Sequence, residues 1–347
     1  MQERELSLED GRDFPADIPC QLGGDMKPFL RFPRVWTQES GRPFRMYWSD
    51  NWQHGLLYPT PTDEELRAFY STEQYDEYMQ AGPGSHRNAS RDFLDRLIDP
   101  VLYRAVALFG EGDKLDADFV RRRVAPPASI LDIGCGPGVM LAELRDHGYE
   151  VAGIDPNPVA LASARERGIR MFAGTGENMP DDVPNEHYDM VTMSQSLEHT
   201  RDPALALGNA ASRLKKGGLL VVEVPNCGSA GFQQRRSVWF HTDAGRHINF
   251  FTRKSLEAFL HAVGLVPVEH GFSGITHQFA RLGDEQECWD ALYRANPMPD
   301  APARPDRWSR LSLFLRVLRG PEEARRDMVW MVGRKADHQS PAPRGPA

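Results

Sequence analysis

The most regular alternation of apolar and polar positions lies between residues 126 and 226. Short apolar runs such as SILDIG, YEVAGIDP and LLVVEVPN are typical of strands buried on both faces, and the stretches between them place apolar residues at helical spacing. Strands that alternate with helices at this pitch predict βαβ units. We therefore expect an α/β fold in which helices cover both faces of a mainly parallel sheet.

The segments before this region follow other patterns. Residues 1–60 mix Pro, Gly, Arg and Trp without a sustained period, which predicts loops and short strands. Residues 61–79 predict a helix with Thr62 as its N-cap. Residues 89–110 predict a second helix that is interrupted or kinked at Pro100.

Two further apolar runs, at residues 265–272 and 327–335, predict the last two strands. The segment 273–326 between them is far longer than a hairpin loop. We expect it to form a helical cap beside the functional site or an oligomer contact, such as the interface of a homodimer. Its amphipathic part, SRLSLFLRVLRG, favours an ordinary packing helix over a membrane-surface helix. The polar, proline-rich tail 336–347 is expected to be disordered.

Composition narrows the class of protein. The 347 residues are 40% hydrophobic and 26% charged, which suits one domain with additions or two domains. A formal net charge of −8 argues against a broad nucleic-acid footprint, which needs a basic face. The start of the chain lacks the apolar core of a signal peptide, and no run approaches the length of a membrane span. We therefore expect a cytoplasmic protein without a stable membrane anchor or a nucleic-acid partner.

The four cysteines do not indicate a metal site or a disulfide framework. Cys20, Cys135, Cys227 and Cys288 are scattered, without Cys-x-x-Cys spacing, and are expected to be reduced thiols. The Asp and His residues show no paired helical spacing and no H-E-x-x-H pattern. The sequence therefore predicts no catalytic metal.

A glycine-rich stretch marks the exit of the first parallel strand. Gly134, Gly136 and Gly138 permit positive φ and close approach of a ligand, and the helix that opens near Val139 offers unpaired N–H groups. Ligands of such sheets sit beyond the carboxyl ends of the strands. The G-x-G-x-x-G spacing of dinucleotide sites is absent because Val139 holds the position of the third glycine, and no Gly-Lys-Ser/Thr ending signals a P-loop.

An acidic residue follows the second parallel strand. Asp155, in VAGIDPNP, lies where a carboxylate can accept hydrogen bonds from both hydroxyls of a ribose. A lone Asp after a strand is more often a helix cap or a loop carboxylate, so its position in a series of motifs matters. The glycine-rich stretch, which lacks the dinucleotide spacing, and Asp155 together indicate a ligand that has a ribose but no pyrophosphate. A nucleoside carrying an amino-acid carboxylate is such a ligand.

At this point the chain resembles the class I S-adenosylmethionine-dependent methyltransferases, in particular the bacterial group similar to the ubiquinone-biosynthesis O-methyltransferase. The resemblance covers roughly residues 126–265 and consists of ordered motifs with the right gaps. The motifs are LDIGCGPG at 131–138, GIDPNP at 153–158, GTGENMP at 174–180, YDMVTMSQSLEHTRDP at 188–203, LKKGGLLVVEVPN at 214–226 and RHINFFTRKSLEAFLHAVGL at 246–265.

This resemblance implies a Rossmann-like, doubly wound sheet of seven strands, six parallel and one antiparallel, with an N-terminal extension and a helical insert between the last two strands. It implies five segments in the chain. These are an N-terminal extension and lid over cofactor and substrate (1–110), the cofactor-binding core (111–272), the helical cap (273–326), the last core strand (327–335) and the disordered tail (336–347). Tyr75 and Tyr78 would belong to the lid, although their spacing is also typical of simple helix packing.

The resemblance also assigns roles to residues at the strand exits. The glycines would lie against the methionine part of S-adenosylmethionine, Asp132 would support their loop, and Asp155 would hold the ribose. Thr175 stands where many relatives have Asp, so Gly176, Glu177 or a backbone group would contact the adenine instead. The residues implied in cofactor binding are Asp132, Gly134, Cys135, Gly136, Gly138, Asp155, Pro156, Gly176, Glu177, Ser194, Gln195 and Ser196.

The expected reaction is an in-line displacement at the methyl group of a sulfonium, which leaves S-adenosylhomocysteine. Such a reaction depends on alignment and dehydration. A hydroxyl acceptor would benefit from a general base, for which His199 and His247 are the candidates, with His241 as a further one. The alternative for His199 is that it caps a helix or packs under the cofactor, while Glu198 pairs with an arginine.

Three functions remain open on the sequence. The favoured one is methylation of a small molecule, such as a hydroxyl of a secondary metabolite, sugar or quinone-like compound, because an acidic protein with a lid and a cap suits an enclosed ligand. The second is a cofactor-binding regulatory protein that has lost catalysis, to which Thr175 is the one pointer. The third is methylation of a macromolecule, which the lack of an Asn/Asp-Pro-Pro-Tyr/Phe motif after the fourth strand disfavours.

Overall fold

The structure, a computed structural model, describes residues 14–32, 42–70, 108–275, 282–294 and 301–336. The expectations for Tyr75, Tyr78 and the tail from residue 337 lie outside the described residues, as does most of the helix expected over 89–110. In the part of the chain that is described, no helix is both long and apolar enough to cross a membrane.

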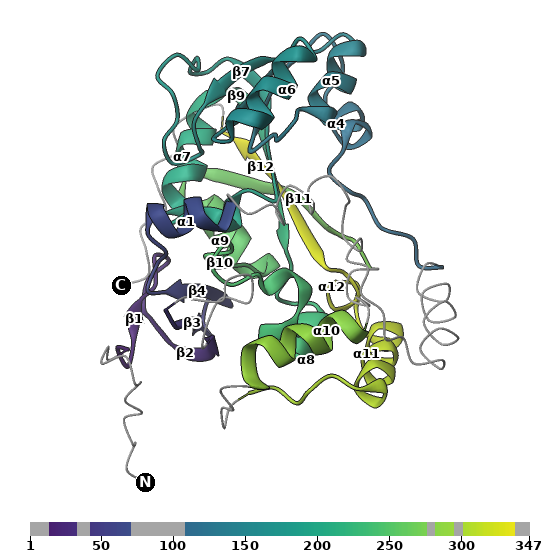
Figure 1. The fold of residues 1–347 in the computed structure, drawn as a ribbon. Coiled ribbons are helices and arrows are strands. Elements are labelled where there is room, and N and C mark those ends of the chain that lie inside the picture. The colour runs from purple at the N-terminus through teal and green to yellow at the C-terminus, as the bar shows by residue number, and fades with distance from the viewer. Residues whose placement is uncertain (1–13, 33–41, 71–107, 276–281, 295–300, 337–347) are drawn as a thin grey trace.

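Seven strands form the central sheet, in the order β11–β12–β9–β8–β5–β6–β7 (Figure 1). They are β5 (Ser129–Ile133), β6 (Glu150–Asp155), β7 (Arg170–Ala173), β8 (Tyr188–Ser194), β9 (Leu214–Pro225), β11 (Leu265–Ser273) and β12 (Met328–Lys335). β12 is antiparallel to both of its neighbours, and every other pairing is parallel. The expected doubly wound sheet of six parallel strands and one antiparallel strand is therefore confirmed.

Helices cover both faces of this sheet. They are α4 (Ala117–Arg123), α5 (Val139–Asp146), α6 (Pro158–Glu166), α7 (Pro203–Arg213) and α9 (Arg253–Ala262). On one face, α7 and α9 bury Leu207 and Phe259 against the strands. On the other, α4, α5 and α6 bury Phe119, Leu141 and Leu161. Burying an apolar side chain of this size contributes roughly 1.5–3 kcal/mol, so these two layers hold the sheet and fix the positions of its strand ends.

Local capping explains where the helices after the strands begin. The side chain of Asn157 accepts a 2.8 Å hydrogen bond from the N–H of Val159, and Pro158 occupies the first turn of α6. The side chain of Asp202 accepts a 2.9 Å bond from the N–H of Leu205 at the start of α7. An Asn or Asp cap followed by proline is a strong helix start. The loops that precede these caps are therefore short and defined.

The residues before the core form, together with the short strand β10 from the core, a second, antiparallel sheet, in the order β1–β2–β3–β4–β10. Its strands are β1 (Ile18–Pro19), β2 (Asp25–Phe32), β3 (Phe44–Ser49), β4 (His54–Tyr58) and β10 (Asn249–Phe250). The short strands were expected, but the pairing of β4 with β10, where Leu56 lies opposite Asn249, was not. This pairing ties the N-terminal sheet to the core.

The helix α1 (Asp63–Tyr70) follows the N-terminal sheet and begins as the sequence predicts. The N–H of Glu65 donates to Oγ1 of Thr62 over 3.2 Å, and the N–H of Thr62 donates back to Oε2 of Glu65 over 2.8 Å. This reciprocal pair is a capping box. The prediction of Thr62 as the N-cap is confirmed.

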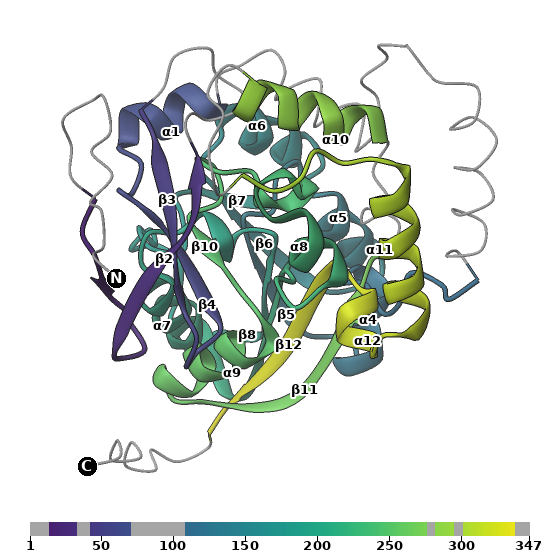
Figure 2. The same ribbon diagram turned by 90° about the horizontal axis from the view of Figure 1, so that it is seen from below.

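The remaining elements gather at one end of the central sheet. They are α8 (Ala230–Arg235), α10 (Leu282–Trp289), α11 (Arg307–Arg319) and α12 (Glu322–Arg325). The last three, together with a π-helical turn at Asp290–Arg294, lie in the helical insert that the sequence predicts between β11 and β12. In Figure 1, α8, α10, α11, α12 and the N-terminal sheet lie in the lower half of the view, and β9 leads down to α8. Figure 2, viewed from below, shows α8 in front of the strands.

Candidate active site

The glycine loop between β5 and α5 leaves open space at one position. Gly134, Gly136 and Gly138 all adopt positive φ, at 80°, 52° and 72°. A Cβ on Gly134 would lie 2.6 Å from Cβ of Ser196, so that glycine allows the β8 exit to pack against the loop. A Cβ on Gly136 would meet nothing within 4 Å. The bare backbone at Gly136 is therefore where a ligand can approach.

Asp155, the last residue of β6, is directed at this loop. Its Oδ2 accepts a 2.9 Å hydrogen bond from the N–H of Gly136, and its Oδ1 accepts a 2.8 Å bond from the N–H of Asn157. Burial raises the pKa of Asp155, and these two backbone donors oppose the rise. A carboxylate has about four acceptor sites, so lone pairs remain for hydroxyl donors. The residue expected to hold a ribose thus lies beside the open glycine.

Asp132 supports the loop from inside the sheet. It is buried, and its Oδ1 accepts a 2.8 Å hydrogen bond from Oγ1 of Thr192 on β8. Burial raises its pKa to about 7; the Thr192 hydrogen bond lowers the pKa, and the nearby Asp155 raises it further. Sγ of Cys135 lies 3.7 Å from the carbonyl oxygen of Gly136 and 3.9 Å from Sδ of Met171. Pro156 is exposed after β6.

The exit of β8 is held by neighbouring strands. Oγ of Ser196 donates to the carbonyl of Ile133 over 2.9 Å, and Oγ of Ser194 donates to Oε2 of Glu223 over 3.2 Å. The N–H of Gln195 donates to the carbonyl of Glu223 over 2.8 Å. Gln195 has φ of 48°, a conformation that is uncommon for a residue with a side chain and is often found at functional sites. Its side chain is exposed and remains available to a ligand.

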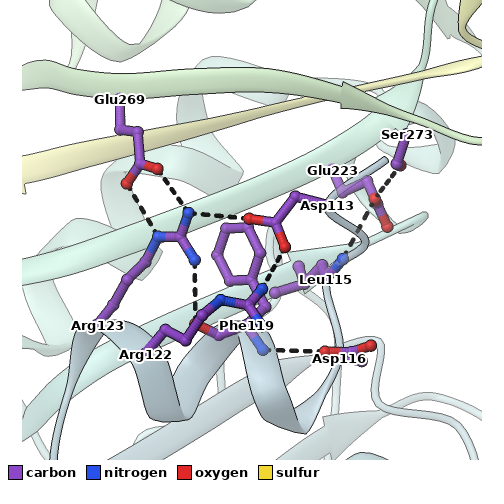
Figure 3. Close-up of polar contacts among 9 residues, drawn as sticks. All are labelled: Asp113, Leu115, Asp116, Phe119, Arg122, Arg123, Glu223, Glu269 and Ser273. Carbon is purple, nitrogen blue, oxygen red and sulfur yellow. Dashed lines mark hydrogen bonds and ion pairs between the residues drawn. The ribbon is translucent and has the colours of Figure 1, made fainter. Parts of the chain in front are cut away.

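Glu223 is the anchor that sequence reasoning missed. Besides Ser194, its carboxylate accepts a 2.7 Å hydrogen bond from Oγ of Ser273 and a 3.4 Å bond from the N–H of Leu115 (Figure 3). It therefore joins β8, β9, β11 and the segment before α4. The sequence did contain a signal for this role, because Glu223 is a single acidic residue that interrupts the apolar run LLVVEVPN. A buried charge needs partners of this kind.

A second set of contacts in Figure 3 fixes the same segment from outside. The guanidinium of Arg123 lies 2.6 Å from Oε1 of Glu269 on β11 and 3.2 Å from Oδ2 of Asp113, and it covers the ring of Phe119 at 3.4 Å. These side chains are partly exposed, so each ion pair contributes little by itself. Together they hold the start of the core domain against the edge strand.

The candidates for adenine contact have other partners. Oε1 of Glu177 accepts hydrogen bonds from the N–H groups of Arg201 and Asp202, at 3.1 and 2.8 Å. Gly176 is buried, where a Cβ would lie 3.1 Å from Cβ of Ala206. Their geometry favours a structural role at the start of α7. A role of Glu177 or Gly176 in cofactor binding stays a prediction.

The two candidate bases lie side by side, although 48 positions separate them in the sequence. The ring centroids of His199 and His247 are 4.8 Å apart. Nδ1 of His199 lies 2.9 Å from the carbonyl of Arg246, and Nδ1 of His247 lies 2.8 Å from the carbonyl of His241. Because a carbonyl only accepts, each Nδ1 carries the proton and each Nε2 keeps its lone pair. His241 takes part through its backbone.

Glu198 completes this cluster. It is 1% exposed, and neither of its carboxylate oxygens has a hydrogen-bond partner among the described residues. One potential ligand atom from each of Glu198, His199 and His247 lies within 4.8 Å of the other two. Burial raises the pKa of Glu198 to about 8 and lowers the pKa of His199 to about 3. At neutral pH the carboxyl group is therefore mostly protonated and the imidazole neutral.

Such a cluster can move a proton, and its donor set can also hold a divalent cation. Sequence reasoning missed the grouping because the three residues come from two distant segments. The expectation that the site uses no catalytic metal stays a prediction.

The fold, the glycine loop and the acidic residue after β6 are the features that this chain shares with the class I S-adenosylmethionine-dependent methyltransferases. Residues 109–270 match the family model described as a methyltransferase domain. The resemblance found in the sequence is therefore confirmed.

Curated relatives agree with this assignment over part of their length. The chain is 34% identical over 100 residues to the ubiquinone biosynthesis O-methyltransferase of Bradyrhizobium sp. (strain ORS 278), an alignment that covers 28% of this chain and 40% of the relative. It is 37% identical over 95 residues to the enzyme of the same name from Yersinia pestis (strain Pestoides F), covering 26% and 39%. The chain thus spans about two fifths of the length of these relatives.

Solved structures also align with the chain. A methyltransferase from Thermotoga maritima is 21% identical with a TM-score of 0.41, and the alignment covers 70% of this chain and 96% of that one. A geranyl diphosphate methyltransferase in complex with sinefungin is 15% identical with a TM-score of 0.42, covering 63% and 78%.

Proposed function

We propose that this protein transfers the methyl group of S-adenosylmethionine to a small-molecule acceptor, and that the accepting atom is a hydroxyl oxygen. The observation that carries the proposal is the pairing of the open backbone at Gly136 with the carboxylate of Asp155. The match of residues 109–270 to a methyltransferase domain supports the same cofactor. The curated relatives are O-methyltransferases by name, which favours oxygen as the acceptor.

The residues at the strand exits suit the parts of this cofactor. The bare backbone of Gly136 leaves room for the methionine part, and the free lone pairs of Asp155 suit the ribose hydroxyls. Gln195 offers an exposed amide from the next strand exit. S-adenosylmethionine supplies an electrophilic methyl group on a sulfonium centre.

The histidine cluster would take the proton of the acceptor hydroxyl. Nδ1 of His199 lies 2.9 Å from the carbonyl of Arg246, so Nε2 carries the lone pair that would accept the proton, and the neighbouring His247 is held in the same tautomer. An imidazole that is neutral at working pH is ready to accept a proton, although its depressed pKa makes it a weak base. Burial at this cluster excludes water, which aids alignment and limits hydrolysis.

A transfer experiment tests this proposal. S-adenosylmethionine labelled in its methyl group would be incubated with the protein and a cell extract, and label would be counted in small-molecule, lipid, protein and nucleic-acid fractions. We expect label in the small-molecule or lipid fraction, and its loss with Asp155→Ala. Label confined to protein or nucleic acid would contradict the small-molecule acceptor. Cofactor binding without transfer to any fraction would favour a regulatory protein.

A further inference from the structure

The helix α11 packs on the core through one of its faces. Leu313 and Val317 are fully buried and belong to one apolar cluster with Ile275, which follows β11. The carbonyls of Val317 and Leu318 accept hydrogen bonds from the guanidinium of Arg325 on α12, at 3.1 and 3.3 Å. The helix therefore packs as the sequence predicts, and its opposite face, here called the outer face, has a fixed position.

Three large apolar side chains form a stripe along the outer face. Trp308 is 77% exposed, Leu311 is 40% exposed and Leu315 is 38% exposed. They are three and four positions apart, so they follow one another along one side of a helix, and all three line the same surface cavity. Single exposed apolar residues are common, but a continuous apolar patch with a polar rim marks a surface that binds a protein or a membrane.

Arginines lie on both sides of this apolar stripe. At 3.6 residues per turn, Arg307 lies on one side of it, and Arg316 and Arg319 lie on the other. All three arginines are exposed, and none of the exposed residues of α11 is acidic. Asp306 precedes the helix as its N-cap, and its Oδ1 accepts a 2.7 Å hydrogen bond from the N–H of Ser309. The charged groups of the outer face are therefore all cations.

This positive face is opposite in sign to the chain as a whole, whose formal net charge is −8. A two-fold contact between copies pairs a surface with itself. If two copies of this chain met through the outer face, the arginines of one helix would lie against those of the other. Like charges in contact disfavour such a dimer, whereas an anionic surface is attracted to them. The outer face thus favours an anionic partner.

The order of side chains across the outer face suits the surface of a bilayer. A helix that lies in a membrane interface buries an apolar stripe among the headgroups and keeps its basic side chains on the polar side. The stem of an arginine can pack along the apolar layer while its guanidinium stays in water. There the planar guanidinium can donate paired hydrogen bonds to lipid phosphates. Trp308 stands at one end of the stripe, and tryptophan is enriched at membrane–water interfaces.

We propose that the outer face of α11 binds reversibly to the surface of an anionic lipid bilayer. The apolar stripe enters the headgroup region, and the flanking arginines contact the lipid phosphates. A few apolar side chains and cations provide peripheral binding and not a permanent anchor. This inference does not depend on the proposed function, because it uses no residue of the candidate active site.

Cosedimentation with vesicles tests the lipid contact. The full chain would be mixed with vesicles of phosphatidylcholine alone, or of equal parts phosphatidylcholine and phosphatidylglycerol, at low and at physiological ionic strength. We expect binding to the mixed vesicles that weakens with salt, because salt screens exposed charges. We expect little binding to phosphatidylcholine alone. No binding to the mixed vesicles, or equal binding to both kinds, would contradict the proposal.

Variants of exposed residues separate the outer face from the rest of the surface. Arg316→Gln and Arg319→Gln should each lower the partition coefficient about fivefold, which is the contribution of one basic residue near an anionic surface. Leu311→Ser should lower it roughly tenfold, because it removes apolar area from the stripe. The matched controls are Arg334→Gln on β12, where the arginine is exposed, and Val266→Ser on β11, where the valine is 50% exposed. Neither control should change binding.

Trp308 reports directly on contact with lipid. Acyl chains that carry bromine quench the fluorescence of a tryptophan that enters the bilayer. Trp308→Phe keeps an apolar ring, so this variant should still bind, while most of the quenching disappears even though the chain has 7 Trp in all. Quenching that persists in Trp308→Phe would mean that another part of the molecule enters the bilayer, and would contradict the proposal.

Sedimentation velocity without vesicles tests a second copy of the chain as the alternative occupant. A wild-type dimer that Leu315→Ser converts into monomers would assign the outer face to self-association and overturn the lipid contact. Thermal unfolding of each variant checks the fold, and we expect unchanged midpoints because the substituted side chains are exposed. Arg319→Gln removes no residue of the apolar stripe, so it keeps the test valid should a serine variant fail to fold.

Discussion

The backbone N–H of Gly136 donates a 2.9 Å hydrogen bond to Oδ2 of Asp155. This bond joins the loop after β5 to the end of β6, two neighbouring strands whose exits carry residues of the proposed cofactor site. Asp155 therefore has two functions in the proposed site. It holds the glycine loop in shape, and it presents its remaining lone pairs beside the open space at Gly136.

Replacement of Asp155 should separate these two functions. Asp155→Asn keeps one acceptor oxygen, and Asp155→Ala keeps none. A hydrogen bond to a charged group contributes about 1.5–3 kcal/mol, so we expect Asp155→Ala to raise the Kd for S-adenosylmethionine by roughly 10 to 100 times or more, and Asp155→Asn by less. Titration calorimetry measures both values. Asp146→Asn, an exposed substitution at the end of α5, is the control, and equal affinity of wild type and Asp155→Ala would contradict the proposed ribose contact.

Gly134 and Gly136 should respond differently to alanine. Gly134→Ala meets Cβ of Ser196 at 2.6 Å and also strains a positive φ, so we expect a loss of about 2 to 5 kcal/mol in unfolding free energy. Gly136→Ala meets no atom and should lose only about 1 to 2 kcal/mol from the backbone, while cofactor affinity falls. Urea denaturation measures the stabilities.

A second substitution at the contact checks the cause of the Gly134 effect. Ser196→Gly removes the atoms that the new methyl group would meet, so the double variant should recover part of the stability lost by Gly134→Ala. Strictly additive losses in the double variant would show that the close approach of Ser196 is not the reason for glycine at position 134.

The buried carboxyl group of Asp132 should make stability depend on pH. Its pKa is about 7 in the folded protein against 3.8 as the ordinary value, so the folded state keeps a proton that the unfolded state loses. Stability from this group is fully present below about pH 4 and is lost as pH rises through 7, by up to about 4 kcal/mol. Asp132→Asn should flatten that decline, and urea midpoints between pH 4 and 8 measure it. A decline of the same size in Asp132→Asn would assign it to another group.

Much of the sheet and of the proposed cofactor site could be predicted because both depend on local sequence. The glycines, Asp155 and the Ser194–Ser196 segment each follow a strand directly, and parallel strands bring their carboxyl ends to one edge. The order of the motifs along the chain then fixes which exits are neighbours. The helix start at Thr62 was equally local, since its capping box spans four residues.

The features that sequence reasoning missed depend on contacts between distant segments. The pairing of β4 with β10 joins residues near 56 and 249, and neither short run has a periodic signal that names its partner. Glu177 lies in the GTGENMP motif, which the resemblance links to adenine. Its carboxylate, however, accepts hydrogen bonds from two backbone N–H groups at the start of α7. The meeting of His199 with His247 likewise follows from tertiary packing.

The cluster of Glu198, His199 and His247 allows a direct test of the expectation that no metal takes part. The leaving group is a neutral thioether and the sulfonium charge is lost during transfer, so a Lewis acid has no developing negative charge to stabilise on the cofactor. We expect substoichiometric metal in the purified protein and an unchanged transfer rate after dialysis against EDTA. Stoichiometric metal that disappears with Glu198→Gln, together with a rate restored by adding that metal, would contradict this prediction.

The role of His199 as a base makes the sharpest prediction for catalysis. His199→Gln keeps a polar side chain but removes the lone pair of Nε2, and general-base catalysis contributes typically 10²–10⁴-fold. We expect kcat to fall by about 100-fold or more, while the Kd for S-adenosylmethionine stays unchanged. Transfer to the acceptor identified with labelled cofactor measures kcat, and titration calorimetry measures the affinity.

The matched variant is His247→Gln, because both imidazoles donate from Nδ1 to a backbone carbonyl. If His199 is the base, His247→Gln should reduce kcat less, since His247 would act by holding the neighbouring ring. A larger loss with His247→Gln would reverse the two roles. Equal kcat in wild type and both variants would mean that the acceptor needs no base, as expected for a nucleophile that is already deprotonated, and would argue against a hydroxyl acceptor with an ordinary pKa.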